Sequence, residues 1–250
     1  MNESAKPFTW PRGAKAAVSL SFDDARLSQP DVGIPILDRF GVKATFYVCN
    51  PNIEKRLEAW RAAVARGHEM GNHTLTHPCS GNFPWSRENA LEDFTLERME
   101  QELVDAGALI RQLLGVQATT FAYSCGQKFV GRGANQQSYV PLVARLFDIG
   151  RDYSNELAAD PWFFDLAAVP SVEFDGINWE TARAFIDGAA KDGRWLIFTG
   201  HNVESSAVPR RSVSPDTLER VCAYCADPAN GIWIDTVAAV GKHVRDQRSV

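Results

Sequence analysis

The sequence lacks the features of a membrane protein and of a nucleic-acid-binding protein. No apolar run approaches the roughly 20 residues that a membrane-spanning helix requires. The 26 Lys and Arg residues are outnumbered by 31 Asp and Glu residues, and the net charge of −5 predicts no basic surface for nucleic acid or anionic lipid. Residues 1–12 have no apolar core after a basic start, which predicts no secretory signal and a cytoplasmic location.

Cysteine is scarce and odd in number. Cys49, Cys79, Cys125, Cys222 and Cys225 cannot all pair, and only the last two have the close spacing of a metal-binding pattern. Those two fall on one side of a predicted amphipathic helix, so we expect them to be buried small residues in a reducing compartment. With 250 residues, of which 45% are hydrophobic and 23% charged, the chain can form one domain with a large core and no disulfides.

Strand patterns alternate with helix patterns along the chain, without internal repeats or a low-complexity linker. The predicted strands cover residues 18–24, 44–48, 69–72, 119–122, 194–199 and 232–234. The predicted helices cover residues 33–40, 54–66, 96–114, 140–147 and 181–190, followed by one capped by Ser214 and a terminal one capped by Asp235. This alternation predicts a mostly parallel sheet closed into a barrel, with functional residues at the C-terminal ends of the strands.

Two adjacent carboxylates end the first predicted strand. Val18, Leu20 and Phe22 alternate with small residues, which is the period of a strand, and Asp23 and Asp24 follow at its tip. Two carboxylates repel each other and lose hydration there, so a cation or proton nearby would favour the arrangement. Successive strand residues point to opposite sides, so one acid could bind a metal while the other faces a reactive water. Taken alone, the pair favours the simpler interpretation that it opens a turn.

Three of the five histidines lie within ten residues of each other. His73 and His77 are four residues apart, so one helical turn would place both imidazoles on the same side, as a metal with nitrogen ligands requires. Pro78 disfavours helix at the residue before it, so this turn should be short and end at a strand–loop junction. The third histidine, His68, is predicted to be a hydrogen-bonded core or loop residue rather than a ligand.

These two motifs resemble those of the polysaccharide deacetylases of the NodB-homology type, also called carbohydrate esterase family 4. Residues 21–24, SFDD, resemble the family's first motif, (T/S)FDD, and residues 73–77, HTLTH, resemble its second, H(S/T)xxH. The run over residues 67–77 is similar to the family's GHEIGNHTxxH throughout. The resemblance extends over about residues 16–244 and is weak over residues 130–192. It implies a distorted (β/α)7 barrel.

A third stretch, residues 121–126 (FAYSCG), follows a predicted strand and turns at its glycine, so its backbone N–H groups could face a cavity. It resembles the family's third motif, RxPYG, in the variant form FAYPYG, with Ser124 at the proline and Cys125 at the tyrosine. The resemblance implies that the main-chain N–H of Cys125 binds the oxyanion. A reactive thiol at Cys125 is the weaker alternative, because no histidine neighbours it in sequence.

Ala122 stands where the third motif normally carries the arginine that pairs with the catalytic base. The partner of Asp23, the residue that the resemblance implies as that base, is therefore left open. Arg151 is one candidate replacement, although a solvated surface charge is the favoured interpretation of that residue.

A single histidine, His201, follows the apolar strand predicted over residues 194–199. It could be a structural cap, but the run resembles the family's fifth motif, whose histidine is the general acid. The fourth motif, which supplies an aspartate to orient that histidine and a tryptophan to the acetyl pocket, has no clear match. The candidates are Asp148, Asp152, Asp165 and Asp175 for the aspartate, and Trp162 and Trp179 for the tryptophan.

The resemblance implies a hydrolase that removes an acetyl group from an N-acetylated or O-acetylated sugar, with Asp23 as base and His201 as acid. Asp24, His73 and His77 would bind one divalent ion, for which Zn²⁺ is favoured and Co²⁺, Ni²⁺ or Mn²⁺ are alternatives. Two other functions stay open: a cytosolic cyclic-amide hydrolase of the allantoinase or imidase type, and a catalytically impaired carbohydrate-binding relative. We expect a small-molecule or short-oligosaccharide substrate and no nucleic-acid or membrane partner, and the sequence leaves homo-oligomerisation open.

Overall fold

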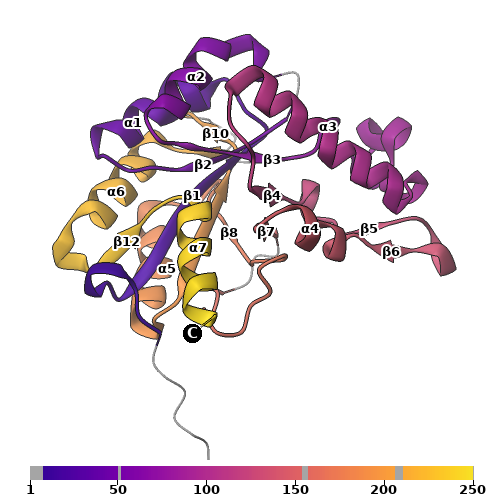
Figure 1. The fold of residues 1–250 in the computed structure, drawn as a ribbon. Helices are drawn as coiled ribbons and strands as arrows, with labels where there is room; N and C mark the ends of the chain where they lie inside the picture. The colour runs from indigo at the N-terminus through magenta and orange to yellow at the C-terminus, as the bar shows by residue number, and fades with distance from the viewer. Residues whose placement is uncertain (1–7, 50–51, 154–156, 206–210, 250) are drawn as a thin grey trace, which may run out of the picture.

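The computed structural model describes residues 8–49, 52–153, 157–205 and 211–249. A sheet of eight strands forms its centre, and every pairing within this sheet is parallel (Figure 1). The strands follow the order β7-β4-β3-β2-β1-β9-β8, and β12 lies beside β1 off this path. Their bounds are β1 Ala16–Asp23, β2 Thr45–Val48, β3 Glu69–Asn72, β4 Thr120–Ala122, β7 Ile149–Arg151, β8 Val172–Glu173, β9 Trp195–Gly200 and β12 Ile232–Ile234.

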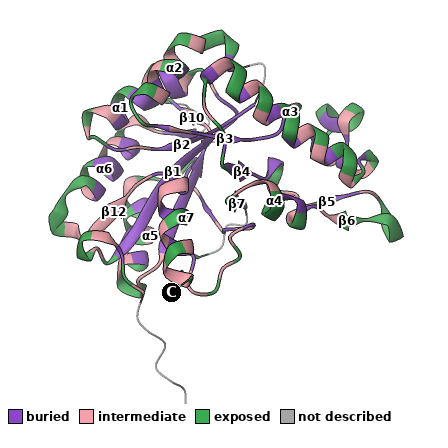
Figure 2. Ribbon diagram, in the orientation of Figure 1, coloured by how far each residue is buried: buried purple, intermediate pink, exposed green. Residues whose placement is uncertain are grey.

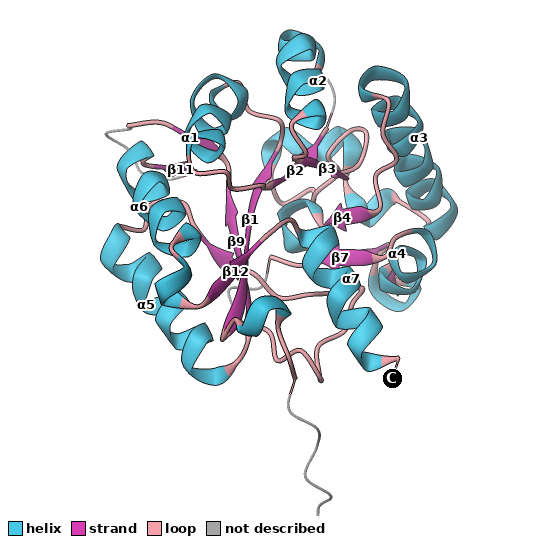
Figure 3. Cartoon of the chain, turned by 60° about the vertical axis from the view of Figure 1, so that its left-hand side comes forward, coloured by secondary structure: helices cyan, strands magenta, loops and turns pink. Residues whose placement is uncertain are grey.

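Helices surround this sheet on its outer side (Figure 3). They are α1 Ile34–Arg39, α2 Leu57–Ala65, α3 Leu96–Leu114, α4 Val140–Leu146, α5 Trp179–Asp192, α6 Pro215–Ala226 and α7 Val237–Arg248. Ser214 caps α6 as predicted, because its side chain accepts a hydrogen bond from the Thr217 N–H. The predicted cap of α7 is wrong: Thr236 caps it, since the N–H of Asp235 still bonds to Val18 and continues the β12 ladder.

The sheet curves into the distorted barrel that the sequence predicts. β1 pairs with β9 along most of its length, while its other side pairs with β12 at its start and with β2 at its end. The two ends of the strand order, β7 and β8, meet through a single bridge between Arg151 and Val169, just before β8 begins. The barrel is therefore closed, but only by a short and irregular segment on this side.

Strand β1 runs through the centre of the core and is buried along its whole length (Figure 2). A parallel strand covered on both faces needs no polar side, and Val18, Leu20 and Phe22 accordingly have no exposed surface. Strands β7 and β8 were not predicted, because they are only three and two residues long and carry no periodic pattern. Two small sheets add β5 (Phe129–Val130) with β6 (Gln137–Ser138), and β10 (Asn202–Val203) with β11 (Ser212–Val213).

No helix in the described part of the chain combines the length and the apolar character needed to cross a membrane.

Candidate metal and catalytic site

The polar side chains singled out in the sequence meet at the C-terminal ends of four strands of the central sheet. Asp23 ends β1, and His73, Cys125 and His201 follow β3, β4 and β9 within three residues. Parallel strands end at the same edge of a sheet, so these distant segments are brought together. They surround a cleft of about 580 Å³. Its walls are formed by Asp23, Asp24, His73, His77, Phe83, Trp85, Tyr123, Cys125, Tyr153, Glu173, Asp175, Gly176, His201 and Arg211.

Asp24, His73 and His77 form a compact group of three candidate metal ligands. Nε2 of His77 lies 3.3 Å and Nε2 of His73 lies 3.6 Å from Oδ1 of Asp24. The predicted helical turn between the histidines is wrong, because residues 73–77, all of them described, form a loop. Thr74 and His77 have left-handed backbone conformations there, and the Thr74 hydroxyl accepts a hydrogen bond from the His77 N–H at 3.0 Å.

The donor set fits a divalent ion in both chemistry and orientation. Nδ1 of His73 lies 2.9 Å from the carbonyl oxygen of Ala122, so it must donate, which leaves Nε2, on the side of Asp24, as the ring nitrogen that could bind a metal. Arg26 donates to Oδ2 of Asp24 at 2.7 and 3.1 Å, which leaves Oδ1 directed at the imidazoles. The three ligand atoms lie within 4.8 Å of one another. Carboxylate and imidazole are ligands that zinc and related ions accept.

The protonation states of these side chains also suit ligation. Burial alone would raise the pKa of Asp24, but the charges of His73, His77, His201 and Arg26 lower it well below its usual value, so the carboxylate is ionised. Burial lowers the pKa of His77 to about 4, with the neighbouring His73 as the next cause. His77 is therefore neutral near pH 7, the form in which imidazole binds metals.

Asp23 has an ion-pair partner that the sequence analysis did not favour. Arg151 is fully buried on β7 and donates from Nη2 to Oδ1 of Asp23, so its predicted role as a solvated charge is wrong. The register of the sheet explains this placement, because Arg151 pairs with Ala122 on the adjacent strand β4. The guanidinium thus comes from the strand beside the position where the motif arginine is missing. The guanidinium carbon Cζ of Arg151 also lies 4.9 Å from the centre of the Tyr47 ring.

Asp175 is the aspartate that contacts His201. Its Oδ2 lies 2.5 Å from Nδ1 of His201, and its Oδ1 accepts the His201 backbone N–H at 3.0 Å. Burial would lower the pKa of His201, but the hydrogen bond with Asp175 and the charges of Asp23 and Asp24 outweigh it and raise the pKa above its usual value.

The other three candidate aspartates have different partners. Asp148 pairs with Arg245, Asp152 pairs with Lys128, and Asp165 accepts the Ala167 N–H.

The sequence analysis missed a glutamine that joins the strand ends carrying Asp23 and His201. Gln29 is fully buried, and its Nε2 donates to the carbonyl oxygens of Asp23 at 2.6 Å and His201 at 2.8 Å. It therefore fixes the end of β1 against the end of β9. No local pattern marks this residue, because its contacts depend on where the two strands meet.

Cys125 lies in the turn after β4 and forms a disulfide with Cys79, which was not predicted. The bond joins the loop that follows His77 to the turn that carries the proposed oxyanion donor. The two cysteines are 46 residues apart and belong to different strand–loop units, so their spacing gave no signal. Cys49, Cys222 and Cys225 are buried and unpaired, as expected for the last two.

Unusual backbone conformations gather at this cleft. Among the described non-glycine residues seven have a positive φ in the left-handed region, and four of them, Asp24, His77, Cys125 and Arg211, line the cleft. Such conformations cost of order 1–3 kcal/mol each and persist where the surrounding structure enforces them. Their concentration here is typical of a functional site.

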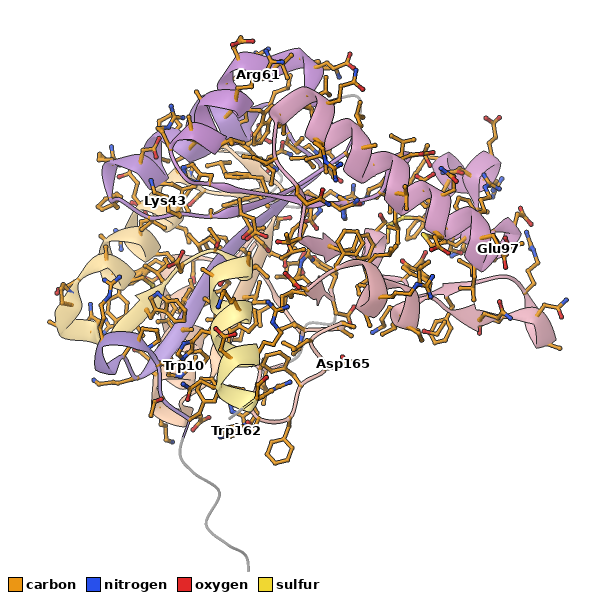
Figure 4. The ribbon with its side chains drawn as sticks, viewed as in Figure 1. Trp10, Lys43, Arg61, Glu97, Trp162 and Asp165 are labelled. Atoms are coloured by element: carbon orange, nitrogen blue, oxygen red, sulfur yellow. A yellow bond between two sulfur atoms is a disulfide. The ribbon has the colours of Figure 1, made fainter. Side chains whose placement is uncertain are left out.

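The tryptophans proposed for the pocket lie elsewhere. Trp162 packs against Phe8 near Trp10, far from the ends of the barrel strands that carry the cleft (Figure 4). Trp179 begins α5 and contacts Tyr224. In the described chain the tryptophan that lines the cleft is Trp85, from a loop to which the sequence analysis assigned no role.

The fold and the site together define an α/β-barrel protein of a hydrolase type. A family model described as "Polysaccharide deacetylase" matches residues 11–137, just over half of the sequence. The chain belongs to the polysaccharide deacetylase family.

Relatives and solved structures agree with this assignment. A chitooligosaccharide deacetylase from Bradyrhizobium sp. is 42% identical over 64 residues, which cover 25% of this chain and 29% of that protein. The matched segments span 4% to 34% of the length of three curated relatives, among them a gellan lyase from Bacillus sp..

Two solved structures show the same fold. A Mycobacterium smegmatis protein classed as a polysaccharide deacetylase has a TM-score of 0.68 at 18% identity, over 98% of this chain and 95% of that chain. A family 4 acetyl xylan esterase from Clostridium thermocellum, solved with a cobalt ion, has a TM-score of 0.58 at 19% identity, over 90% of each chain.

Proposed function

We propose that this protein is a metal-dependent hydrolase that removes the acetyl group from an N-acetylated sugar. The observation that carries the proposal is the convergence of two separate units in one cleft: the ligand group Asp24, His73 and His77, and the acid–base pair Asp23 and His201. Relatives named as deacetylases of chitooligosaccharides and of peptidoglycan N-acetylglucosamine support this substrate class.

The ligand group would hold one divalent ion, with Zn²⁺ favoured by its imidazole and carboxylate donors and Co²⁺, Ni²⁺ or Mn²⁺ as alternatives. When bound, such an ion lowers the pKa of water toward roughly 7 and polarises the substrate carbonyl. Asp24 and the two imidazoles provide the negative charge and lone pairs that hold it. Arg26 restrains Asp24 so that one carboxylate oxygen faces the site.

Asp23 acts as the general base that takes the proton from the attacking water. Its Oδ1 is held by Arg151, and its Oδ2 lies 4.0 Å from Nε2 of His73, so the free oxygen faces the ligand group. A carboxylate within hydrogen-bond reach of an acidified water can complete its deprotonation as the attack proceeds. Arg151 therefore orients the base without contacting the substrate itself.

His201 gives a proton to the departing amine. An amide nitrogen leaves poorly unless it is protonated, and an imidazolium is the side chain best suited to donate near neutral pH. The hydrogen bond between Nδ1 and Asp175 holds the ring so that Nε2 can carry the transferred proton. The backbone N–H of Cys125 would stabilise the oxyanion that develops on the acetyl oxygen.

The two alternative functions receive less support. The cyclic-amide hydrolase is not favoured, since the related enzymes are named for acetylated glycans. An impaired carbohydrate-binding relative is not favoured either, because Arg151 and Asp175 supply the partners of base and acid that appeared to be missing. The cytoplasmic location stays a prediction that the Cys79–Cys125 bond does not support, since disulfides are typical of oxidising compartments.

The direct test is product analysis with metal-loaded protein. N-acetylchitotetraose, N-acetylglucosamine and allantoin are each supplied, and free acetate, free amine and ring-opened ureide are quantified. We expect acetate and amine in equal amounts from an acetylated sugar, and loss of both after chelation. Opening of the ureide ring without any acetate release would contradict the proposal.

A further inference from the structure

The two ring nitrogens of His77 face different groups. Nε2 lies 3.3 Å from Oδ1 of Asp24 in the ligand group, whereas Nδ1 lies 3.8 Å from Sγ of Cys79. That sulfur is bonded to Sγ of Cys125, so the ring contacts both the ligand group and the disulfide. The ligand atoms of His77, Cys79 and Cys125 lie within 4.8 Å of one another. They form a second group of candidate metal ligands, which shares one residue with the first.

The spacing of this second group fits a tetrahedral zinc ion once the disulfide is reduced. Zinc binds sulfur at about 2.3 Å and imidazole nitrogen at about 2.1 Å, so two such ligands at a tetrahedral angle lie roughly 3.6 Å apart. The 3.8 Å between Nδ1 of His77 and Sγ of Cys79 is close to that value. The two sulfurs need a separation of roughly 3.8 Å, which is about the contact distance of sulfur atoms that are no longer bonded.

The disulfide is open to reduction from the side of the cleft. Cys125 is exposed and lines the cleft, whereas Cys79 has no exposed surface. One thiolate of a dithiol reductant can therefore attack Sγ of Cys125, which breaks the S–S bond and releases Cys79 as the thiolate. The second thiol of the reductant then displaces Cys125. The reductant leaves as a cyclic disulfide, and two electrons and two protons pass to the cysteines.

Contacts around the disulfide hold the two loops together without it. The Ser80 N–H donates to Oε1 of Gln127 at 2.6 Å, which joins the segments that follow the two cysteines. The Ser86 hydroxyl accepts the Cys79 N–H at 3.0 Å and donates to the Cys79 carbonyl at 2.9 Å. Both thiols should therefore stay beside His77 after reduction.

We propose that reduced Cys79 and Cys125 form, with Nδ1 of His77, a second site for a thiophilic divalent ion such as Zn²⁺. Water from the cleft would take the fourth position, as in zinc sites with three protein ligands. A neutral imidazole has one lone pair, so an ion on Nδ1 leaves a proton on Nε2 and withdraws His77 from the ligand group. The thiolates carry two negative charges, against one on Asp24. Reduction therefore shifts the ion from the ligand group to the thiolates.

The test uses Co²⁺ as the probe, because thiolate ligands give this ion an intense charge-transfer absorption in the near ultraviolet. Metal-free wild type is titrated without oxygen, before and after reduction by dithiothreitol that is then removed by gel filtration. We expect no such absorption in the oxidised protein, and an absorption that saturates at about one Co²⁺ per chain in the reduced protein. The Cys79→Ser/Cys125→Ser double variant, treated in the same way, should show none.

Two histidine variants separate the second site from the first. His73→Ala removes a ligand of the first group alone, so the reduced variant should keep the thiolate absorption. His77→Ala removes the shared ligand. Loss of a residue that merely orients a metal ligand already costs about 10–100-fold in affinity, so Co²⁺ should bind the reduced His77→Ala variant at least about tenfold more weakly. Near-ultraviolet circular dichroism of the same samples reports whether their native packing is kept.

Four results would overturn the inference. Absence of the absorption in the reduced wild type would mean that the thiols bind no ion, and equal affinity in His77→Ala would mean that they bind it without the histidine. Two ions per reduced chain would contradict the competition between the sites. Loss of native packing on reduction would mean that the loops do not hold the site. The inference goes beyond the proposed function, and none of these measurements requires turnover, so either can fail without the other.

Discussion

Arg151 is bonded to Asp23 across 128 positions of sequence, and it does so from the strand position that pairs with Ala122. The buried guanidinium and carboxylate compensate each other's charge. Either group alone would be an unpaired charge in a buried position, which is strongly unfavourable. The family motif places an arginine at the position of Ala122. In this chain the same charge reaches the base from the neighbouring strand.

This relationship predicts that an arginine at position 122 can partly replace Arg151 as the partner of Asp23. We expect Arg151→Ala to leave Asp23 as an uncompensated buried charge, which lowers the free energy of unfolding by about 3–5 kcal/mol and strongly reduces turnover. The double variant Arg151→Ala with Ala122→Arg should recover part of both. Unfolding in denaturant and acetate release measure the two effects, and a double variant no better than the single one would argue against the exchange.

The contact between Asp175 and His201 makes a prediction about pH dependence. His201 donates its proton in the proposed mechanism, so activity should fall as pH rises through its raised pKa. Asp175→Asn removes the negative partner and lowers that pKa, so the alkaline limb of the kcat/KM profile should move to lower pH. An alkaline limb that stays in place would show that another group controls it.

The Cys79–Cys125 bond predicts a redox effect on stability. It closes a loop of 46 residues, and such bonds stabilise proteins by about 2–4 kcal/mol. We therefore expect a thiol reductant to lower the thermal unfolding midpoint of the wild type. The Cys79→Ser/Cys125→Ser double variant should start from that lower midpoint and be insensitive to the reductant. Equal sensitivity of both proteins would place the effect elsewhere.

The parts of the site that sequence could predict are those with a local pattern. Asp23 and Asp24 come at the end of an alternating strand, and His73 and His77 lie close together in a recognisable motif. The sequence therefore indicated both pairs as candidate site residues and placed them at strand ends. The barrel likewise followed from alternating strands and helices. The prediction of a helical turn between the histidines was wrong. A spacing of four residues also fits a loop in which Thr74 and His77 have left-handed conformations and the Thr74 side chain bonds to the His77 N–H.

The remaining residues depend on contacts between distant segments. Arg151 lies on a three-residue strand without a periodic pattern, and only the β4–β7 register reveals its role. Gln29 matters because β1 and β9 end side by side, and Cys79 and Cys125 because two loops meet above the sheet. No property of these residues in isolation distinguishes them from ordinary polar or buried side chains.

The most direct measurement is the metal content of the purified protein and of variants that each remove one proposed ligand. His243→Gln serves as the matched control, because this histidine lies on α7, away from the cleft, where its Nε2 is 2.7 Å from the carbonyl oxygen of Thr9. We expect about one divalent ion per chain in the wild type and in the control, and a loss of about 10-fold or more in affinity in Asp24→Asn, His73→Ala and His77→Ala. Unchanged metal content in the His73→Ala and His77→Ala variants would contradict the proposed site.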